Sequence, residues 1–422
     1  MPRASRAQSG PPAAAGRIVE PSPGRRGAPY NVSMALPPEV CIRGAGIVGR
    51  TLALLLARER VRVALVAEAP STPSPDRPDV RAYALNAASR GLLESLRAWP
   101  DAAQATPVRE MQVFGDEDGR VRFDAAEQKV DALAWIVDVP ALEEQLAAAV
   151  RFSPQVEVVT APVKAALTVV CEGKASLTRE ALGVQYDVTR YPQIAIAARL
   201  EAERPHGGVA RQWFSAQGDV LALLPMGGAE GRQLALVWSV GQLRAPELLA
   251  LEADAFCARL REASHEALGG FTLSSERAAW PLQRATADRW AGRFAEGGAW
   301  VLAGDAAHTV HPLAGQGLNL GLADAAELAR VIRERDYWRS VGDARLLRRY
   351  ERARRADVLA MGLATDGLQQ LFAQGIEPLA RLRNWGMLGF DRSHLLKSWV
   401  ARRAMGLASG ISSPSPSGRG LG

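Results

Sequence analysis

Three glycines near the start of the chain have the spacing of a turn that binds a nucleotide. Gly44, Gly46 and Gly49 follow an apolar run that predicts a strand at residues 40–43, and a helix is predicted at 51–58. In such a turn the first glycine allows the tight bend and the second lets the backbone approach a pyrophosphate. The third lets helix and strand pack closely, and the helix N-terminus faces the phosphate charge.

An acidic residue follows at the place where such a unit binds ribose. Residues 61–67 predict a second strand, and Glu68 comes directly after it. A carboxylate there can hold the two hydroxyls of a ribose. A glycine-rich turn without a ligand is the alternative, but strand, helix, second strand and acid together favour dinucleotide binding.

A second glycine-rich motif begins at Gly304 and leads into a helix predicted at 318–334. Asp305 follows a strand predicted at 300–303, where its carboxylate can accept hydrogen bonds from a ribityl chain. Backbone N–H groups and the helix N-terminus would stabilise negative charge, as on the pyrimidine edge of a reduced flavin. The residues that would deliver these groups are Gly315, Gln316, Gly317, Leu318 and Asn319.

A metal site is the other chemistry that this segment could support. Asp305, His308 and His311 carry ligand atoms, but their spacings match no common zinc motif. The three cysteines lie far apart and form no C-x-x-C pair. We therefore predict no metal, and a reduced cytoplasmic protein without a disulfide framework.

The net charge of +6 comes mostly from the ends of the chain, since residues 1–33 hold five arginines against one glutamate. The nearly neutral remainder predicts no binding of nucleic acid. The chain has no apolar run long enough to predict a membrane-spanning helix. Residues 1–33 and 409–422 predict disordered tails; a transit peptide, or a true start at Met34, are alternatives for the first.

The elements between the tails predict two interleaved domains. The strand–helix–strand start is followed by a helix at 141–150. Short alternating runs at 193–200, 208–214, 220–224 and 233–240, separated by glycine and proline, predict an antiparallel sheet. Helical patterns follow at 246–268 and from residue 344 onward.

The motifs resemble those of the ubiquinone-biosynthesis hydroxylases, a family of class A flavoprotein monooxygenases with the fold of para-hydroxybenzoate hydroxylase. Residues 311–324 (HPLAGQGLNLGLAD) are similar to the family's own signature. The resemblance covers nearly all of residues 40–407. It includes RAYALNAASRGLL, the Trp-Pro-Leu run at 280–282 and YERARRADVLAMGLATDGLQQLF.

The resemblance implies an α/β fold. A Rossmann-like FAD-binding domain of the glutathione-reductase type would be interleaved with an antiparallel-sheet substrate domain and followed by a C-terminal helical region. We assign residues 38–110, 141–185 and 276–340 to the first, 111–140 and 186–275 to the second, and 341–408 to the third.

The resemblance also implies roles for single residues, and FAD rather than NAD as the bound dinucleotide. Gly44, Gly46 and Gly49 would lie against the pyrophosphate, with Glu68 at the adenosine ribose. Arg81 would reach the phosphates or the flavin edge, with a surface salt bridge as the alternative.

On the flavin side, Asp305 would bind the ribityl chain. Gly317, Leu318 and Asn319 would face the pyrimidine part of the ring system, and Pro312 would lie near its reacting face. Pro312 and Asn319 are therefore the candidates for residues at the flavin face.

The chain departs from the family at a third motif, a DG pair that serves both FAD and NAD(P)H. Here the pair is Glu172-Gly173, followed by Ser176, with Arg179 in the expected place. The longer carboxylate changes a position where small displacements matter. A core-packing role for Glu172 is as well supported as a functional one.

The implied reaction is hydroxylation of an aromatic ring through a C4a-hydroperoxyflavin, with NAD(P)H and O2 as co-substrates. A polyprenylated phenol of ubiquinone biosynthesis is the implied substrate, in an apolar pocket under the antiparallel sheet. The alternatives are a non-catalytic FAD-binding scaffold of a biosynthetic complex and an FAD-dependent isoprenoid reductase.

The segment at 378–407 mixes arginines with tryptophan and phenylalanine. This composition predicts either peripheral contact with the inner membrane or a helix docked on a partner, in a homo-oligomer or a biosynthetic complex.

Overall fold

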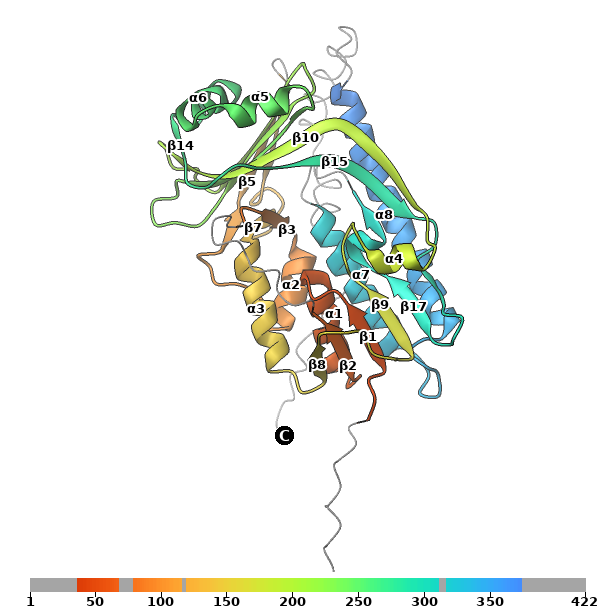
Figure 1. Cartoon of the computed structure of the whole chain (residues 1–422). Helices are drawn as coiled ribbons and strands as arrows, with labels where there is room; N and C mark the ends of the chain where they lie inside the picture. Colours follow the sequence, from red (N-terminus) through yellow and green to blue (C-terminus); the bar gives the residue numbers. More distant parts are fainter. Residues whose placement is uncertain (1–35, 68–78, 116–118, 311–315, 374–422) are drawn as a thin grey trace, which may run out of the picture. The chain divides into compact units, whose positions relative to one another are not determined.

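The computed structural model of the chain describes residues 36–67, 79–115, 119–310 and 316–373 (Figure 1). The predicted tails at 1–33 and 409–422 lie outside these residues. So do the segment at 378–407, and Glu68, Pro312 and Gly315 among the predicted site residues.

A six-stranded sheet forms the first layer, and its strands are parallel except for one at the edge. The strands at 40–43, 61–67 and 300–303 predicted from the sequence are all in this sheet. In order across the sheet the strands are β16 (Ala291–Arg293), β17 (Ala299–Leu302), β9 (Leu167–Val170), β1 (Val40–Arg43), β2 (Val63–Val66) and β8 (Val156–Val159).

Helices pack on this sheet and on one another to form the larger of the two main hydrophobic cores. Because strands of a parallel sheet are covered on both faces, β1, β2 and β17 read as continuous apolar runs. The helices are α1 (Ile47–Arg58), α2 (Ala87–Ser95), α3 (Val139–Arg151), α7 (Gln316–Arg333) and α8 (Ala344–Ala373).

A nine-stranded sheet forms the second layer, and it contains the four alternating runs that predicted it. Neighbouring strands are antiparallel except for the parallel pair β5–β11. The strands are β5 (Glu110–Phe114), β6 (Arg120–Asp124), β10 (Tyr186–Ala202), β11 (Val209–Phe214), β12 (Val220–Pro225), β13 (Gln233–Gly241), β14 (Phe271–Leu273), β15 (Ala278–Ala287) and β18 (His308–Thr309).

The helical pattern at 246–268 corresponds to two helices in the structure. These are α5 (Arg244–Ala250) and α6 (Ala253–Ala263), and the residues between them are extended. The Arg277 guanidinium donates hydrogen bonds of 3.0 and 2.8 Å to the carbonyls of Leu248 and Leu251. A distant side chain therefore takes carbonyls that a continuous helix would use internally.

Figure 1 shows α5 and α6 on the side of the large sheet that faces away from α1 and α7. The residues that meet these helices alternate along the strands with smaller ones on the opposite face. Those small residues are Ala195, Ala197, Ala222, Val237 and Ser239, and they pair across β10, β13 and β12. The sheet thus presents a shallow inner face to the rest of the chain.

A three-stranded antiparallel sheet, not predicted from the sequence, lies beside both layers. Its strands are β3 (Ala82–Leu85), β7 (Ala134–Asp138) and β4 (Ala105–Val108). Ile136 and Val108 pack with Ala210 of the large sheet, while Leu85 and Val137 belong to the core of the parallel sheet. The boundaries assigned above to the two domains stay a prediction.

Candidate functional site

The three motifs begin side by side at one edge of the parallel sheet. Arg43, Val170 and Leu302 end β1, β9 and β17, and Val170 is in register with each of the other two. Since these neighbouring strands are parallel, the loops that follow them leave the sheet at the same level. The turn at Gly44, the Glu172 loop and the Gly304–Asp305 turn therefore share one edge, where open α/β sheets bind their ligands.

The glycine turn has the geometry that its spacing predicts. Gly44 has φ +105°, and a Cβ there would lie 2.5 Å from the Cys171 carbonyl oxygen. A Cβ at Gly49 would lie 1.9 Å from the Gly44 carbonyl oxygen. A Cβ at Gly46 would meet nothing within 4 Å. Two glycines thus permit close packing within the protein, whereas the space beside Gly46 is free for a ligand.

The N-terminus of α1 is suited to a phosphate. Gly46 caps the helix without a side-chain hydrogen bond, and the first turn contains no acidic residue. Its backbone N–H groups and the positive end of the helix dipole are thus left for an anion. The residues present fit a dinucleotide pyrophosphate, although Glu68, predicted at the ribose, lies outside the described residues.

The Gly304–Asp305 turn is held by contacts on both sides. It forms a short helix, η1 (Gly304–Ala306), with Gly304 at φ +61°. The Asp305 carbonyl accepts a 2.8 Å hydrogen bond from the Tyr186 hydroxyl, and the Ala306 carbonyl accepts one of 3.3 Å from Arg179 Nη1. The Asp305 side chain remains exposed to solvent, free to accept hydrogen bonds from a ligand.

The surroundings of Asp305 make its carboxyl a weaker acid than usual. Burial raises its pKa, and the neighbouring charges of His308, Lys174 and Arg81 oppose this only in part. The Asp305 side chain reaches solvent on one side, but the many protein atoms around it reduce the hydration of its carboxyl group. A carboxyl in such surroundings is stabilised by hydroxyl donors, as the ribityl chain would provide.

The Glu172 carboxylate is fully engaged inside its own loop. It accepts hydrogen bonds from Ser176 Oγ at 2.7 Å and from Thr178 through N and Oγ1 at 3.0 and 2.5 Å. Arg43 Nε lies 3.0 Å away as an ion pair. Burial opposes ionisation, but these hydrogen bonds and the Arg43 charge hold the pKa of Glu172 below its ordinary value.

The Glu172 loop is also closed by Arg179, a buried residue of α4 (Leu177–Ala181). Its Nη2 donates a 2.9 Å hydrogen bond to the Lys174 carbonyl. Gly173, between Glu172 and Lys174, has φ +78°. The glutamate is therefore part of an ordered structure, and Arg179 joins this loop to the Gly304–Asp305 turn.

Asn319, predicted at the flavin face, uses its side chain to hold another segment. Its Nδ2 donates to the Ala84 carbonyl at 2.8 Å, and its Oδ1 accepts from the Asn86 N–H at 3.0 Å and from Ser89 Oγ at 2.7 Å. The amide thus fixes the connection from β3 to α2. Contact of its backbone, and of Gln316, Gly317 and Leu318, with the flavin stays a prediction.

Arg81 directly precedes β3. It forms a salt bridge, which was the alternative to a contact with FAD. Its Nε lies 2.9 Å from Asp79 Oδ1, and Nη2 lies 3.8 Å from Glu143. Its charge nevertheless acts on Asp305, as stated above. A contact of Arg81 with FAD stays a prediction.

The sequence suggested no role for Asp324, and it suggested His308 only as a possible ligand in a metal site that its spacing argues against. In the structure both are buried and bonded to each other at 2.6 Å. The only signal in the sequence was the position of Asp324 as the last residue of the quoted signature. Within the described residues, no group of three or more histidine, cysteine, aspartate or glutamate side chains could hold a metal ion.

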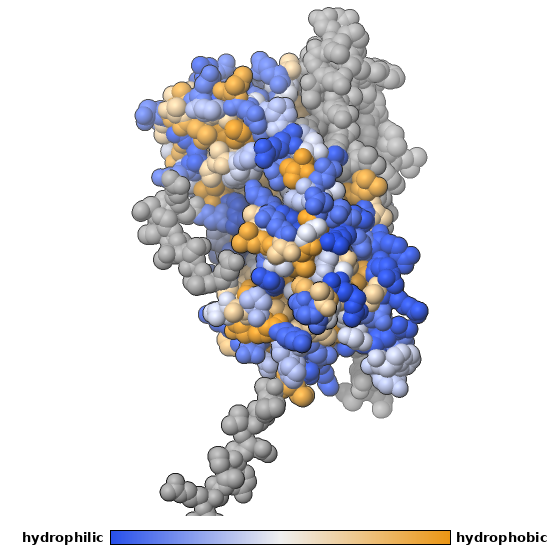
Figure 2. All heavy atoms as spheres, turned by 45° about the vertical axis from the view of Figure 1, so that its right-hand side comes forward, coloured by the Kyte–Doolittle hydropathy of each residue, from blue (hydrophilic) through white to orange (hydrophobic). Residues whose placement is uncertain are grey.

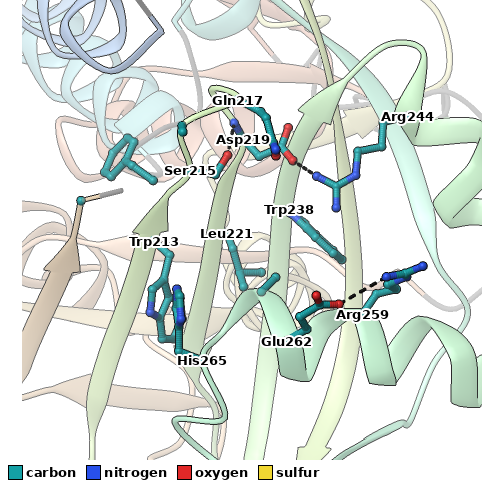
Figure 3. Close-up of a pocket in the computed structure, with 14 residues that line it drawn as sticks. Trp213, Ser215, Gln217, Asp219, Leu221, Trp238, Arg244, Arg259, Glu262 and His265 are labelled. Atoms are coloured by element: carbon teal, nitrogen blue, oxygen red, sulfur yellow. Dashed lines mark hydrogen bonds and ion pairs between the residues drawn. The ribbon is translucent and has the colours of Figure 1, made fainter. Parts of the chain in front are cut away.

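A cavity of about 410 Å³ lies on the opposite side of the large sheet, toward α6 (Figure 3). Trp213, Leu221 and Trp238 line it together with the ion pair of Asp219 and Arg244. This cavity is partly polar and is not the apolar pocket predicted for a substrate. The apolar substrate pocket stays a prediction. Among the described residues, the small side chains on the inner face of the large sheet are the ones expected to border it.

The arrangement of two sheets and three converging loops defines a flavoprotein monooxygenase fold. The structure matches Pseudomonas aeruginosa PqsL in complex with 2-aminobenzoylacetate with a TM-score of 0.68 and 22% identity, over 83% of this chain and 99% of that one. It also matches the p-nitrophenol 4-monooxygenase PnpA of Pseudomonas putida DLL-E4, with a TM-score of 0.67 and 17% identity, over 87% and 98%.

Comparison of sequences narrows the class to a family. A family model described as an FAD binding domain matches residues 138–362. The 3-demethoxyubiquinol 3-hydroxylase of Escherichia coli (strain K12) is 30% identical over 406 residues, which cover 88% of this chain and 99% of that protein. The ubiquinone hydroxylase UbiL of Rhodospirillum rubrum is 32% identical over 392 residues, with 87% and 89% covered.

The chain therefore belongs to the ubiquinone-hydroxylase family of FAD-dependent monooxygenases. Its cofactor is FAD, and NAD(P)H is the co-substrate typical of this family. None of the helices in the part of the chain that the structure describes is long and apolar enough to cross a membrane.

Proposed function

We propose that the chain hydroxylates the aromatic ring of a polyprenylated phenol in ubiquinone biosynthesis. The observation that carries this proposal is the convergence of three motifs at the in-register ends of β1, β9 and β17. The names of the relatives support the substrate class, since one is a 3-demethoxyubiquinol 3-hydroxylase and the other a ubiquinone hydroxylase.

The chain's own residues would divide the work between binding and positioning. Gly46 and the N-terminus of α1 hold the pyrophosphate of FAD, and Asp305 accepts hydrogen bonds from its ribityl hydroxyls. Bound FAD, reduced by NAD(P)H, supplies the activation of O2 that ring hydroxylation requires. Arg179 and Tyr186 hold the Asp305 turn, so that the carboxylate does not have to reorganise when the cofactor binds.

The inner face of the large sheet would hold the substrate. Ala195, Ala197 and Ala222 have small side chains, which would let a bulky ring and its tail approach the strands closely. The same face of β10 carries Arg199, whose guanidinium is bonded to Asp138 and to the Arg81 carbonyl.

Peripheral contact with the inner membrane, from the cytoplasmic side, is the second part of the proposal. A prenylated substrate lies in lipid, so its enzyme has to reach the bilayer surface. Tyr337 and Trp338, in the connection between α7 and α8, are 92% and 67% exposed. The exposed residues Arg345, Arg348 and Arg352 follow on α8, and within the described part of the chain their side chains form no ion pair. The coloured surface at the lower right of Figure 2 is largely hydrophilic.

Substrate-dependent oxygen consumption tests the hydroxylase proposal. The purified holoenzyme is expected to consume O2 and NAD(P)H in step with hydroxylated product when a prenylated phenol is added. A tightly bound flavin with no turnover on any prenylated phenol would favour the non-catalytic scaffold instead. Reduction of the prenyl double bonds without O2 uptake would favour the isoprenoid reductase.

Flotation with vesicles of anionic phospholipid, compared with neutral ones, tests the membrane contact separately.

A further inference from the structure

Asp324, in the middle of α7, binds three separate parts of the chain. Its Oδ2 accepts hydrogen bonds from the Gly304 N–H at 2.9 Å and from His308 Nε2 at 2.6 Å. Its Oδ1 accepts a 2.7 Å hydrogen bond from Arg354 Nε of α8. The Asp324 side chain is completely buried, and His308 and Arg354 are nearly so.

The carboxylate is charged in this environment. Burial opposes its ionisation, but the charges of His308 and Arg354 and their hydrogen bonds hold the pKa of Asp324 below its ordinary value. An ionised carboxylate can only accept hydrogen bonds, so His308 Nε2 has to carry the proton of the 2.6 Å contact. The Trp290 ring, stacked at 5.0 Å, fixes the plane of the imidazole.

One carboxylate therefore clamps the cofactor-binding turn at both ends. Gly304 precedes Asp305, and His308 follows it by three positions. Between these two anchors the Asp305 and Ala306 carbonyls are taken by Tyr186 and Arg179. The turn has left-handed backbone at Gly304, φ +61°, a conformation that glycine adopts without steric cost.

We propose that Asp324 is a positioning residue for FAD. It holds the turn from Gly304 to His308 in the conformation that presents Asp305 to the cofactor, and it couples that turn to α8 through Arg354. This inference rests on FAD being the cofactor and is independent of which phenol is hydroxylated.

The chain contains a matched control for a purely structural role. Asp219 is also a buried aspartate, and it pairs with Arg244 and accepts a 3.4 Å hydrogen bond from the Gly241 N–H (Figure 3). Its partners, an arginine and a glycine N–H, are of the same kinds as two of the Asp324 partners. Asp219 directly precedes β12 of the large sheet and lines the cavity beside α6, and its partners Arg244, Ser215 and Gly241 lie outside the three converging loops.

The experiment compares Asp324→Asn with Asp219→Asn in the full chain. FAD is removed, and the dissociation constant for FAD is measured from quenching of flavin fluorescence at temperatures where each apoprotein is folded. Asp324→Asn is expected to weaken FAD binding by at least tenfold, because the amide NH2 cannot accept a hydrogen bond and therefore opposes the donors either of the Gly304–His308 turn or of Arg354. Asp219→Asn is expected to lower the melting temperature of the apoprotein and to leave FAD affinity within twofold of the parent.

A second readout separates positioning from general loosening. The visible absorption bands of bound FAD report on the hydrogen bonds around the flavin, so they are expected to shift in Asp324→Asn and not in Asp219→Asn. An unchanged FAD affinity in Asp324→Asn, with only a lower melting temperature, would overturn the proposal. If Asp324→Asn does not fold, His308→Ala removes one tie and leaves the carboxylate with Gly304 and Arg354. That variant is expected to weaken FAD binding severalfold, and parent-like affinity there overturns the proposal equally.

Discussion

The guanidinium carbon of Arg179 lies 3.7 Å from the centre of the Tyr186 ring. Arg179 is in the short helix after the Glu172 loop, and Tyr186 is the first residue of β10 in the large sheet. Both also bond to carbonyls of the Asp305 turn. The pair therefore joins the loops at the edge of the parallel sheet to the start of the large sheet.

Arg179→Lys is expected to loosen this junction. Lysine keeps the charge but loses the flat stacking surface and the second hydrogen bond, at a cost of about 1–3 kcal/mol. We expect FAD affinity to fall by roughly tenfold, as that energy implies, when measured by titration of the apoprotein. Arg244→Lys is the control, since Arg244 lies over the Trp238 ring on the far side of the large sheet. Equal losses of FAD affinity in both variants would contradict the role given to Arg179.

Gly46→Val is expected to abolish FAD binding, because the added side chain would occupy the space left for the pyrophosphate. The flavin absorbance of the purified variant measures this directly. Gly91→Val is the matched control: a Cβ at Gly91 also meets nothing within 4 Å, and Gly91 is exposed on α2. The control is expected to keep its flavin despite the helix-propensity cost. Normal FAD occupancy in Gly46→Val would refute the assignment of the glycine turn.

The motifs could be predicted from the sequence because each is local. The roles of Gly44 and Gly49 follow from their spacing beside a strand and a helix, and the contacts at both positions agree with it. The four alternating runs of the large sheet were predictable for the same reason, since period-two alternation is a property of the strand itself. The convergence of the three loops then follows from parallel pairing.

The remaining features depend on contacts between distant residues. The break between α5 and α6 is set by Arg277, which lies 29 and 26 positions from the carbonyls it binds. The Asp324 cluster spans separations of 16, 20 and 30 positions. The small sheet of β3, β4 and β7 escaped notice because β3 and β4 are only four residues long and show no alternation. No pattern within a short window encodes such relations.

The pKa of Glu172 predicts how the protein responds to acid. Because its folded-state pKa is held below the unfolded value of about 4.3, the carboxylate contributes stability at pH values above that unfolded pKa. This contribution is lost as the pH falls through the folded pKa. Urea unfolding of the parent and of Glu172→Gln is therefore expected to show a stability difference at pH 7 that shrinks in acid. A difference that stays constant from pH 7 to pH 3 would contradict the charged hydrogen-bonded state.

Glu172→Asp tests whether the departure from the family's DG pair is a defect or an adaptation. The glutamate makes three hydrogen bonds within its loop and an ion pair with Arg43. A side chain shorter by one methylene cannot reach all of these partners, and each one left unpaired costs roughly 1–3 kcal/mol. We therefore expect the aspartate variant to be reduced more slowly by NAD(P)H, while FAD affinity, which depends on the glycine turn and Asp305, changes little. Anaerobic stopped-flow measurement of flavin bleaching reports the reduction step alone, because no oxygen chemistry can follow.

Glu110→Asp is the control, since Glu110 is likewise bonded to an arginine, Arg122, at the far edge of the large sheet. Faster reduction in Glu172→Asp than in the parent would show that glutamate impairs the nucleotide step, and the loop would then have to be regarded as a damaged family motif.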